Sequence, residues 1–296
     1  MKNKLLLFLL QLFGWLPLTA GRLLGCILGR VIYALKLGPV LVSQVNLRLC
    51  YPQMSPQQRE SLCRERMLHF GQAFVETPRV WSKSSAWLES KIVAVEGIEF
   101  FQAAMAAKPG TILIVPHLGN WEVVGLWASS RCQMTSLYEP PKIPELGAWI
   151  KKSREQAGAT LVPTDGRGVA ALIKALKRGE TTGILPDQQP EESGGMFAPF
   201  MGVQTRTMTL LTNLMARSGC RALFCTAIRE PGGWRLHFVP ADDALYSADK
   251  ATAVSALNAG VEKLVALAPE QYQWEYKRFR AQPDGSNPYA KGIQEH

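Results

Sequence analysis

The side chains best placed to do chemistry in this sequence are those of His117 and Glu122, which bound the segment HLGNWE. An apolar run, residues 111–116, precedes this segment, and a second, residues 123–128, follows it. A histidine and a carboxylate thus stand a few residues apart between two stretches that favour burial. That arrangement is typical of a general base and the acidic partner that orients it. The sequence has four histidines, and only His117 is placed in this way.

The spacing of this pair constrains how it can act. On one continuous helix, the two side chains would diverge by about 140°. They can meet only if His117 lies on the turn from a strand into a helix, which Gly119 permits, with Asn120 as the N-cap. The Glu122 carboxylate would then accept a hydrogen bond from one imidazole nitrogen, and the other nitrogen would deprotonate a substrate. The alternative, a capping carboxylate beside a structural loop histidine, fits the spacing equally well.

No residue of the protein is marked as a nucleophile. The sequence lacks a GxSxG motif, and none of its six cysteines stands in an activating context. The cysteines form no CxxC pair and have no zinc-ligand spacing, so we expect reduced thiols in a cytosol-facing domain, with no metal and no other cofactor. If His117 is a base, its target is then a hydroxyl group of the substrate, as in group transfer to an alcohol.

The charge distribution indicates a membrane surface as a partner. The net charge is +9, and no acidic residue occurs before Glu60 in a stretch that is otherwise apolar. The basic residues of that stretch are Lys2, Lys4, Arg22, Arg30, Lys36, Arg48 and Arg59. A cationic and apolar surface fits an anionic lipid face. Nucleic-acid binding favours dense basic clusters with a recognisable motif, and because the sequence shows none, we expect no nucleic-acid partner.

Residues 5–20 form a long apolar segment behind two lysines. Three structures fit it: a signal peptide cleaved after Ala20, a transmembrane helix, or a monotopic anchor in one leaflet. A helix of this length spans about 24 Å against a hydrocarbon core of about 30 Å. We favour an uncleaved N-terminal membrane-anchoring helix, in-plane or as a tilted short span, within residues 1–40, followed by a catalytic domain in residues 41–296. An ordinary buried helical pair is the alternative.

Strand-like and helix-like segments alternate through most of the remaining chain. This alternation predicts an α/β fold with a mixed sheet flanked by helices. The run 111–115 is β-branched and aliphatic, as in a strand buried on both faces, and Ser55-Pro56 is a helix start. We expect further strands at 134–138, 159–162, 182–185, 222–229 and 234–240, with a hairpin turn at 230–233. We expect helices at 56–81, 99–107, 123–128, 143–157, 169–177, 207–218 and 252–267.

These residues resemble a known family. His-x4-Glu after an apolar strand resembles the glycerolipid acyltransferase superfamily, and HLGNWE with the later LPDQ at 185–188 resembles its lipid A biosynthesis branch. The match extends over nearly the whole chain, including QVNLR at 44–48. The resemblance implies transfer of a fatty acyl chain from an acyl carrier protein thioester to a hydroxyl of a glycolipid, the lipid A precursor, in lipopolysaccharide biosynthesis. It also implies a place at the bacterial inner membrane, with the catalytic domain facing the cytoplasm.

The resemblance also assigns roles to residues. It makes His117 the catalytic base and Glu122 its partner, at a position where some relatives have aspartate. Arg154 resembles the family's basic residue near the active site, where it would bind a phosphate or stabilise an oxyanion. A solvated helix face is the structural alternative for Arg154.

Three further residues are candidates for binding the substrate or the oxyanion. Asp187 and Gln188 follow a predicted strand, where α/β sites gather, and they would orient the substrate or Arg154. A simple polar turn is the alternative for both. Asn120 matches the motif as well, and for it we expect capping and packing before any contact with substrate.

Other functions remain open at this point. The chain would act on a different membrane lipid, such as an aminolipid or a phosphoglycerol, if its acceptor site differs from that of the lipid A branch. A non-catalytic lipid-binding protein is the alternative from another class, although such a module has no need of a base. A metal-dependent hydrolase would lose activity with a chelator, whereas the acyltransferase would not.

Overall fold

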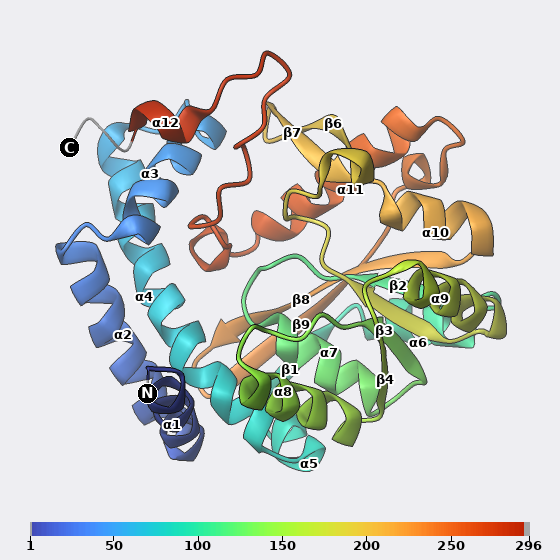
Figure 1. Cartoon of the computed structure of the whole chain (residues 1–296), viewed down its shortest axis with the longest axis horizontal. Coiled ribbons are helices and arrows are strands. Elements are labelled where there is room, and N and C mark those ends of the chain that lie inside the picture. The colour runs from blue at the N-terminus through green and yellow to red at the C-terminus, as the bar shows by residue number, and fades with distance from the viewer. Residues whose placement is uncertain (1, 293–296) are drawn as a thin grey trace.

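The computed structural model describes residues 2–292 and has a central sheet with helices on both faces (Figure 1). The seven strands lie in the order β1-β9-β8-β2-β5-β3-β4. All neighbours are parallel except β8 and β9, which form an antiparallel hairpin through Glu230 and Gly233. The strand bounds are β1 Ile92–Glu96, β2 Thr111–Ile114, β3 Met134–Leu137, β4 Ala159–Val162, β5 Thr181–Ile184, β8 Arg221–Glu230 and β9 Gly233–Pro240. The predicted mixed sheet flanked by helices, with its hairpin, is confirmed.

The central strand β2 shows how the sheet separates two hydrophobic cores. Ile112 and Ile114 belong to one core, while Leu113 and Val115 belong to the other. The two sets alternate because successive side chains of a strand point to opposite faces. The predicted burial of β2 on both faces is therefore confirmed. The helices around the sheet are α5 Ser85–Glu89, α6 Ile98–Ala106, α7 Trp121–Ser129, α8 Pro144–Gln156, α9 Gly166–Arg178, α10 Leu210–Ser218 and α11 Lys250–Val265. The short helix α12, Pro288–Gly292, packs instead against the N-terminal helix at Gly38–Cys50.

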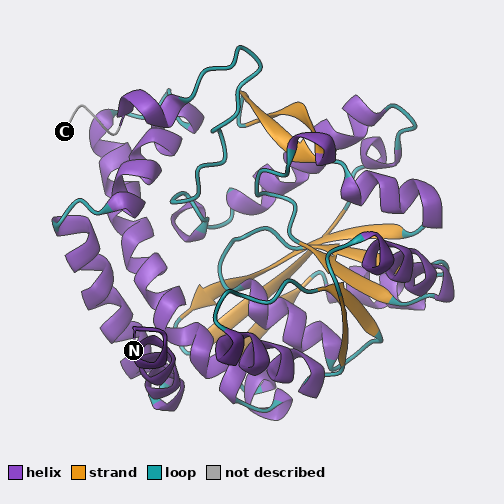
Figure 2. Ribbon diagram, in the orientation of Figure 1, coloured by secondary structure: helices purple, strands orange, loops and turns teal. Residues whose placement is uncertain are grey.

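Some strands differ from the sequence-based expectation. The edge strand β1 was not predicted, and neither was a separate hairpin of β6 (Gly195–Phe200) and β7 (Val203–Met208), which lies beside α11 (Figure 2). The helix expected from residue 207 begins only at Leu210, because residues up to Met208 pair with β6. Pairing with a partner strand here overrides a local helical pattern.

The first four helices of the chain pack together on one side of the sheet (Figure 1). They are α1 Lys2–Trp15, α2 Leu18–Ala34, α3 Gly38–Cys50 and α4 Pro56–Ser82. The predicted start of α4 is confirmed, because Ser55 forms a capping box with Gln58.

The apolar segment expected to form one N-terminal membrane-anchoring helix is divided between two helices. Within residues 2–292, no single helix is both long enough and apolar enough to cross a membrane. Helices α2 and α3 meet both criteria only when they are taken together, and they are bent by 78° relative to each other. The apolar run 5–20 is divided between α1 and α2 at Leu16-Pro17. Proline lacks an N–H and disfavours helical geometry in the residue before it, so the helix ends there.

Helix α2 packs on α4 through a seam of glycines, Gly25 and Gly29 on α2 and Gly71 on α4. A Cβ atom at Gly29 would lie 2.2 Å from the Met67 carbonyl oxygen, and one at Gly71 would lie 2.0 Å from the Gly25 carbonyl oxygen. Only glycine allows two backbones to approach this closely. On its other face α2 exposes large apolar side chains, namely Leu23, Leu24, Ile27 and Val31.

Candidate active site

His117 lies on the turn between β2 and α7, as the spacing predicted. We call residues 117–120 the histidine loop. The turn depends on Gly119, which has a φ of +64° and whose Cβ, if present, would lie 2.0 Å from the Ala227 carbonyl oxygen. Both the left-handed backbone and the lack of space exclude other residue types. The loop is held by main-chain hydrogen bonds, from Gly119 N–H to the Gln271 carbonyl and from Asn120 N–H to the Ala227 carbonyl.

The carboxylate that contacts the imidazole is that of Asp187. Nδ1 of His117 lies 2.8 Å from Oδ1 of Asp187, and the main-chain N–H of His117 donates to Oδ2 at 2.8 Å. Asp187 follows β5, which is the parallel neighbour of β2, so the carboxyl ends of the two strands bring these residues together. Burial alone would raise the pKa of Asp187, but the contact with His117 and the charge of Arg278 hold it below its ordinary value. An ionised Asp187 can only accept, so Nδ1 of His117 carries the proton.

This geometry leaves Nε2 of His117 as the basic nitrogen. The Gln188 amide nitrogen lies 3.2 Å from Nε2 and also donates to Oε1 of Gln273 at 3.0 Å. The Trp121 ring packs against the imidazole, with 4.8 Å between ring centroids. Asp187 and Gln188, expected to orient the substrate or Arg154, thus both contact the histidine itself.

Glu122 does not accept the hydrogen bond from His117 that we expected. It forms an ion pair with Arg154 of α8, at 2.5 Å from Nη2 to Oε1 and 3.2 Å from Nε to Oε2. Burial would lower the pKa of Arg154, and the adjacent Glu122 carboxylate raises it above its ordinary value. The pair is partly accessible, since 28% of the Arg154 side chain and 7% of the Glu122 side chain are exposed. Arg154 therefore lies on the partly covered face of α8, held by two contacts, and not on a freely solvated one.

Asn120 is at the N-cap position of α7, but its side chain does not cap the helix. Its amide donates instead to Oε1 of Glu76 at 3.1 Å, in the buried interior. The expected capping role is therefore wrong, because a buried carboxylate lies within reach of the amide.

Two apolar cavities share Trp121 as a lining residue. The larger, of about 330 Å³, is lined by His117, Gly119 and Trp121 together with side chains of α1 and α4. Its apolar lining includes Leu6, Leu10, Phe70, Ala73, Phe74, Trp81 and Leu146. The smaller, of about 90 Å³, is lined by Glu122, Arg154 and apolar side chains at the ends of the central strands. His117 thus borders one apolar cavity, and the Glu122–Arg154 ion pair borders the other.

Among the described residues, no three or more His, Cys, Asp or Glu side chains gather at distances suited to a metal ion. Burial raises the pKa of the Cys50 and Cys225 thiols, so neither is a ready nucleophile.

Asp187 was not predicted from the sequence as the partner of His117. The available signal was that each follows a buried strand and that neighbouring parallel strands end at the same edge. Three further residues were not predicted either; they contact the histidine loop on its buried side and are Glu76, Arg229 and Gln271.

Known proteins resemble this chain over most of its length. A family model described as bacterial lipid A biosynthesis acyltransferase matches residues 3–281. The lipid A biosynthesis palmitoleoyltransferase of Escherichia coli (strain K12) is 30% identical over 254 residues, covering 83% of this chain and 80% of that protein. The lauroyltransferase of the same organism is 28% identical over 272 residues, covering 88% and 86%. Its myristoyltransferase is 25% identical over 254 residues, covering 83% and 77%. The chain, with its His117–Asp187 contact beside an apolar cavity, belongs to the bacterial lipid A biosynthesis acyltransferase family.

Proposed function

We propose that this protein transfers a fatty acyl chain from an acyl carrier protein thioester to a hydroxyl of a lipid A precursor, with His117 as general base. The observation that carries the proposal is the His117–Asp187 contact at the wall of an apolar cavity. Asp187 holds the imidazole in the tautomer that leaves Nε2 free to accept a proton. The names of the relatives support both the acyl chain and the lipid A acceptor.

The reaction requires one base and no covalent enzyme intermediate. The acceptor hydroxyl takes the place of the Gln188 amide at Nε2 of His117 and gives its proton to that nitrogen. Its oxygen bonds to the thioester carbonyl carbon, which forms a tetrahedral oxyanion. When the oxyanion collapses, the carbon–sulfur bond breaks, and the proton passes from Nε2 to the departing thiolate. The products are the ester and the free thiol.

Arg154 is the group suited to an anion in this site. It is charged at every physiological pH, partly accessible, and fixed by two contacts to Glu122. We assign it to a phosphate of the acceptor or to the developing oxyanion, which a fixed guanidinium binds well. Glu122 then acts through Arg154, as a positioning residue, and Asn120 acts by holding the histidine loop.

The N-terminal helices supply the contact with the membrane in this proposal. Helices α1 and α2 expose large apolar side chains, including Leu5, Phe8, Trp15, Leu23 and Ile27. Exposed apolar patches of this kind, beside basic residues, favour an anionic lipid surface. We place the protein at the cytoplasmic face of the inner membrane, where the net charge of +9 also attracts an acidic carrier protein.

The decisive experiment incubates the purified protein with acyl carrier protein thioesters of several chain lengths and with candidate acceptors. Mass spectrometry then identifies each product. We expect an acylated lipid A precursor with the wild type and none with His117→Ala. Equal product from both proteins would refute the mechanism. Acylation of an aminolipid or a phosphoglycerol alone would assign a different acceptor, and binding of lipid with no acylation would favour a lipid-binding protein.

A further inference from the structure

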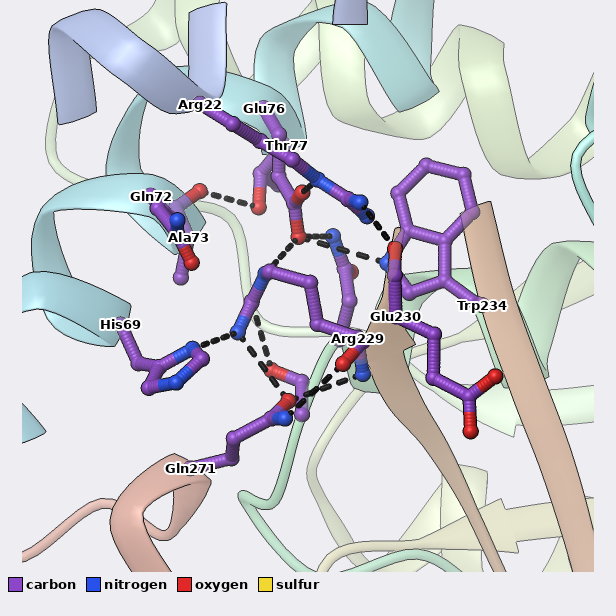
Figure 3. A network of polar contacts seen from close by, with 12 residues as sticks. Arg22, His69, Gln72, Ala73, Glu76, Thr77, Arg229, Glu230, Trp234 and Gln271 are labelled. Atoms are coloured by element: carbon purple, nitrogen blue, oxygen red, sulfur yellow. Dashed lines mark hydrogen bonds and ion pairs between the residues drawn. The ribbon is translucent and has the colours of Figure 1, made fainter. Parts of the chain in front are cut away.

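Glu76 of α4 lies at the centre of a buried polar network behind the histidine loop (Figure 3). Its side chain is fully buried and forms ion pairs with two arginines. Arg22 Nε lies 2.8 Å from Oε2, and Arg229 Nε lies 2.7 Å from Oε1. The indole N–H of Trp234 also donates to Oε1, at 3.3 Å. A carboxylate with this many donors is held in one orientation.

One side of the network holds the histidine loop. The Asn120 amide donates to Oε1 of Glu76 at 3.1 Å, and Nη2 of Arg229 donates to the Gly119 carbonyl at 3.3 Å. Gln271 accepts from the main-chain N–H of Arg229 at 2.8 Å through its side-chain oxygen, and its carbonyl accepts from Gly119 N–H at 3.2 Å. The network therefore holds the loop that carries the catalytic histidine, together with the hydrogen bond from Asn120 N–H to the Ala227 carbonyl. The Asn120 side chain takes part in the network and does not cap α7.

The other side of the network reaches the N-terminal helices through Arg22 of α2. Beyond its contact with Glu76, Arg22 donates to the Glu230 carbonyl at 2.5 Å and to the Gly233 carbonyl at 2.8 Å. Its guanidinium carbon lies 5.0 Å from the centre of the Trp234 ring. These contacts use most of its donors, and only 11% of the side chain is exposed. Arg22 is thus a built part of the interior, unlike the exposed basic residues of the same region.

The charges of the network are stable at neutral pH. Burial would raise the pKa of Glu76, but Arg229 and Arg22 hold it below its ordinary value. Burial, together with the charges of Arg229 and Arg66, lowers the pKa of His69 to about 3. His69 is therefore neutral, and its Nδ1 lies 3.3 Å from Nη1 of Arg229, where it can accept. Removal of Arg22 would leave Glu76 with a single arginine partner in a buried setting, where charges need fixed partners.

We propose that Arg22, acting through Glu76, is a positioning residue for catalysis: it links helix α2 to the histidine loop and keeps the imidazole in its reactive place. The proposal rests on the proposed function only in taking His117 as the base. Displacement of a catalytic group by about 1 Å can lower turnover about a hundredfold. The apolar helices at the start of the chain would then contribute to catalysis through the interior as well as to lipid contact.

The test compares Arg22→Gln with Arg30→Gln, which removes the same charge from an exposed position on the same helix. Turnover is measured with a water-soluble thioester and detergent-dispersed acceptor, so that binding to vesicles plays no part. We expect kcat to fall at least about tenfold in Arg22→Gln with KM within about twofold, and Arg30→Gln to match the wild type. Arg22→Lys keeps the charge but lacks the planar set of N–H donors of a guanidinium, so its kcat should lie between those of the wild type and Arg22→Gln. Equal kcat in Arg22→Gln and Arg30→Gln would overturn the proposal.

A second variant tests the same path without disturbing α2. Asn120→Leu removes the contact of the loop with Glu76 and leaves the Arg22–Glu76 pair intact. If both residues act through Glu76, the double variant Arg22→Gln/Asn120→Leu should have a kcat only slightly below that of the more impaired single variant. Fully additive losses would refute a shared path. If Arg22→Gln fails to fold, Arg22→Lys takes its place in this comparison and in the exchange measurement.

Hydrogen exchange separates this inference from the proposed function. The amides of Gly119 and Asn120 are hydrogen-bonded in the wild type and should exchange faster in Arg22→Gln, while those of the distant strand β4 should not. Unchanged exchange in the loop would overturn the proposal. If the wild type transfers no acyl chain, the proposed function fails, but the exchange measurement still decides whether Arg22 holds the loop.

Discussion

Asp187 accepts two hydrogen bonds from one residue, His117: one from the ring Nδ1–H and one from the main-chain N–H, each on its own carboxylate oxygen at 2.8 Å. The two contacts fix both the direction of the ring and the position of the backbone that carries it. A carboxylate can satisfy both donors, whereas a carboxamide has only one acceptor oxygen.

Asp187→Asn should therefore inactivate the enzyme without unfolding it. One of the two His117 donors would face an NH₂ group, and the ring would lose its tautomer or its orientation. We expect kcat to fall about 10²- to 10⁴-fold with little change in KM, measured by steady-state acyl transfer. Circular dichroism should match the wild type. A variant with nearly full activity would show that Asp187 does not orient the base.

Glu122 and Arg154 should behave as one unit. In Glu122→Gln the arginine loses its ionic partner, and in Arg154→Gln the carboxylate loses its two donors. A double-mutant cycle on kcat/KM should therefore give a coupling energy of about 0.5–3 kcal/mol. Arg154→Lys should also be impaired, because lysine cannot make the bidentate contact. Independent, additive effects of the single substitutions would contradict a positioning role for Glu122.

Gly119→Ala should destabilise the protein through the backbone. The φ of +64° is unfavourable for alanine, and the new Cβ would meet the Ala227 carbonyl oxygen at 2.0 Å. We expect a loss of at least about 1–3 kcal/mol, visible as a lower Tm. Gly125→Ala is the matched control, because Gly125 lies in α7 and a Cβ atom added there would meet nothing within 4 Å. Alanine is favoured over glycine in a helix by about 1 kcal/mol, so Gly125→Ala should leave the stability of the protein unchanged or raise it.

The stability contributed by Glu76 should disappear on acidification. Its folded pKa lies below the ordinary value of about 4.3, so its contribution is fully present above pH 4.3 and is lost as the pH falls through the lower folded value. Glu76→Gln should cost about 3–5 kcal/mol at pH 7, because it leaves buried arginine charge uncompensated. Thermal unfolding from pH 7 to pH 3 should show the Tm gap between wild type and variant narrowing below about pH 4. A gap that stays constant would argue against an ionised Glu76.

Exposed apolar side chains of α1 should govern binding to lipid vesicles. Phe8 is 61% exposed and Trp15 is 83% exposed, and each would leave water on contact with lipid. Loss of one such side chain is worth about 1.5–3 kcal/mol when burial is complete. We expect Phe8→Ser with Trp15→Ser to weaken cosedimentation with anionic vesicles at least about tenfold. Leu267→Ser, at a site 50% exposed outside the N-terminal helices, is the control and should bind normally.

Local signals predicted much of the fold. The apolar run of β2 and the capping residues of α4 each specify their own element, and Gly119 marks the turn that places His117 ahead of α7. The split of the apolar run between α1 and α2 was also visible locally, because Pro17 ends the first helix. Strand β1 carried no such signal, since its register depends on β9, which lies far along the chain.

The partners within the site were less accessible from sequence. Asp187 lies 70 positions after His117, and the two meet only because β5 is the neighbour of β2. Arg154 lies 32 positions after Glu122, on another helix. With both carboxylates available, proximity in the chain favoured Glu122 as the partner of the histidine, and the order of the strands decided for Asp187.

The glycine seam between α2 and α4 has a consequence for where the protein can be stable. Backbone surfaces that fit this closely are held by dispersion and shape, which do not require water to drive them together. A contact between large apolar side chains would weaken if lipid replaced water around it, because the hydrocarbon would solvate the separated side chains equally well. The close backbone contact at Gly25, Gly29 and Gly71 does not depend on water, so it should be equally stable when lipid replaces water around the helices. Helix α2 can therefore expose its outer face to hydrocarbon while its inner face remains packed against α4.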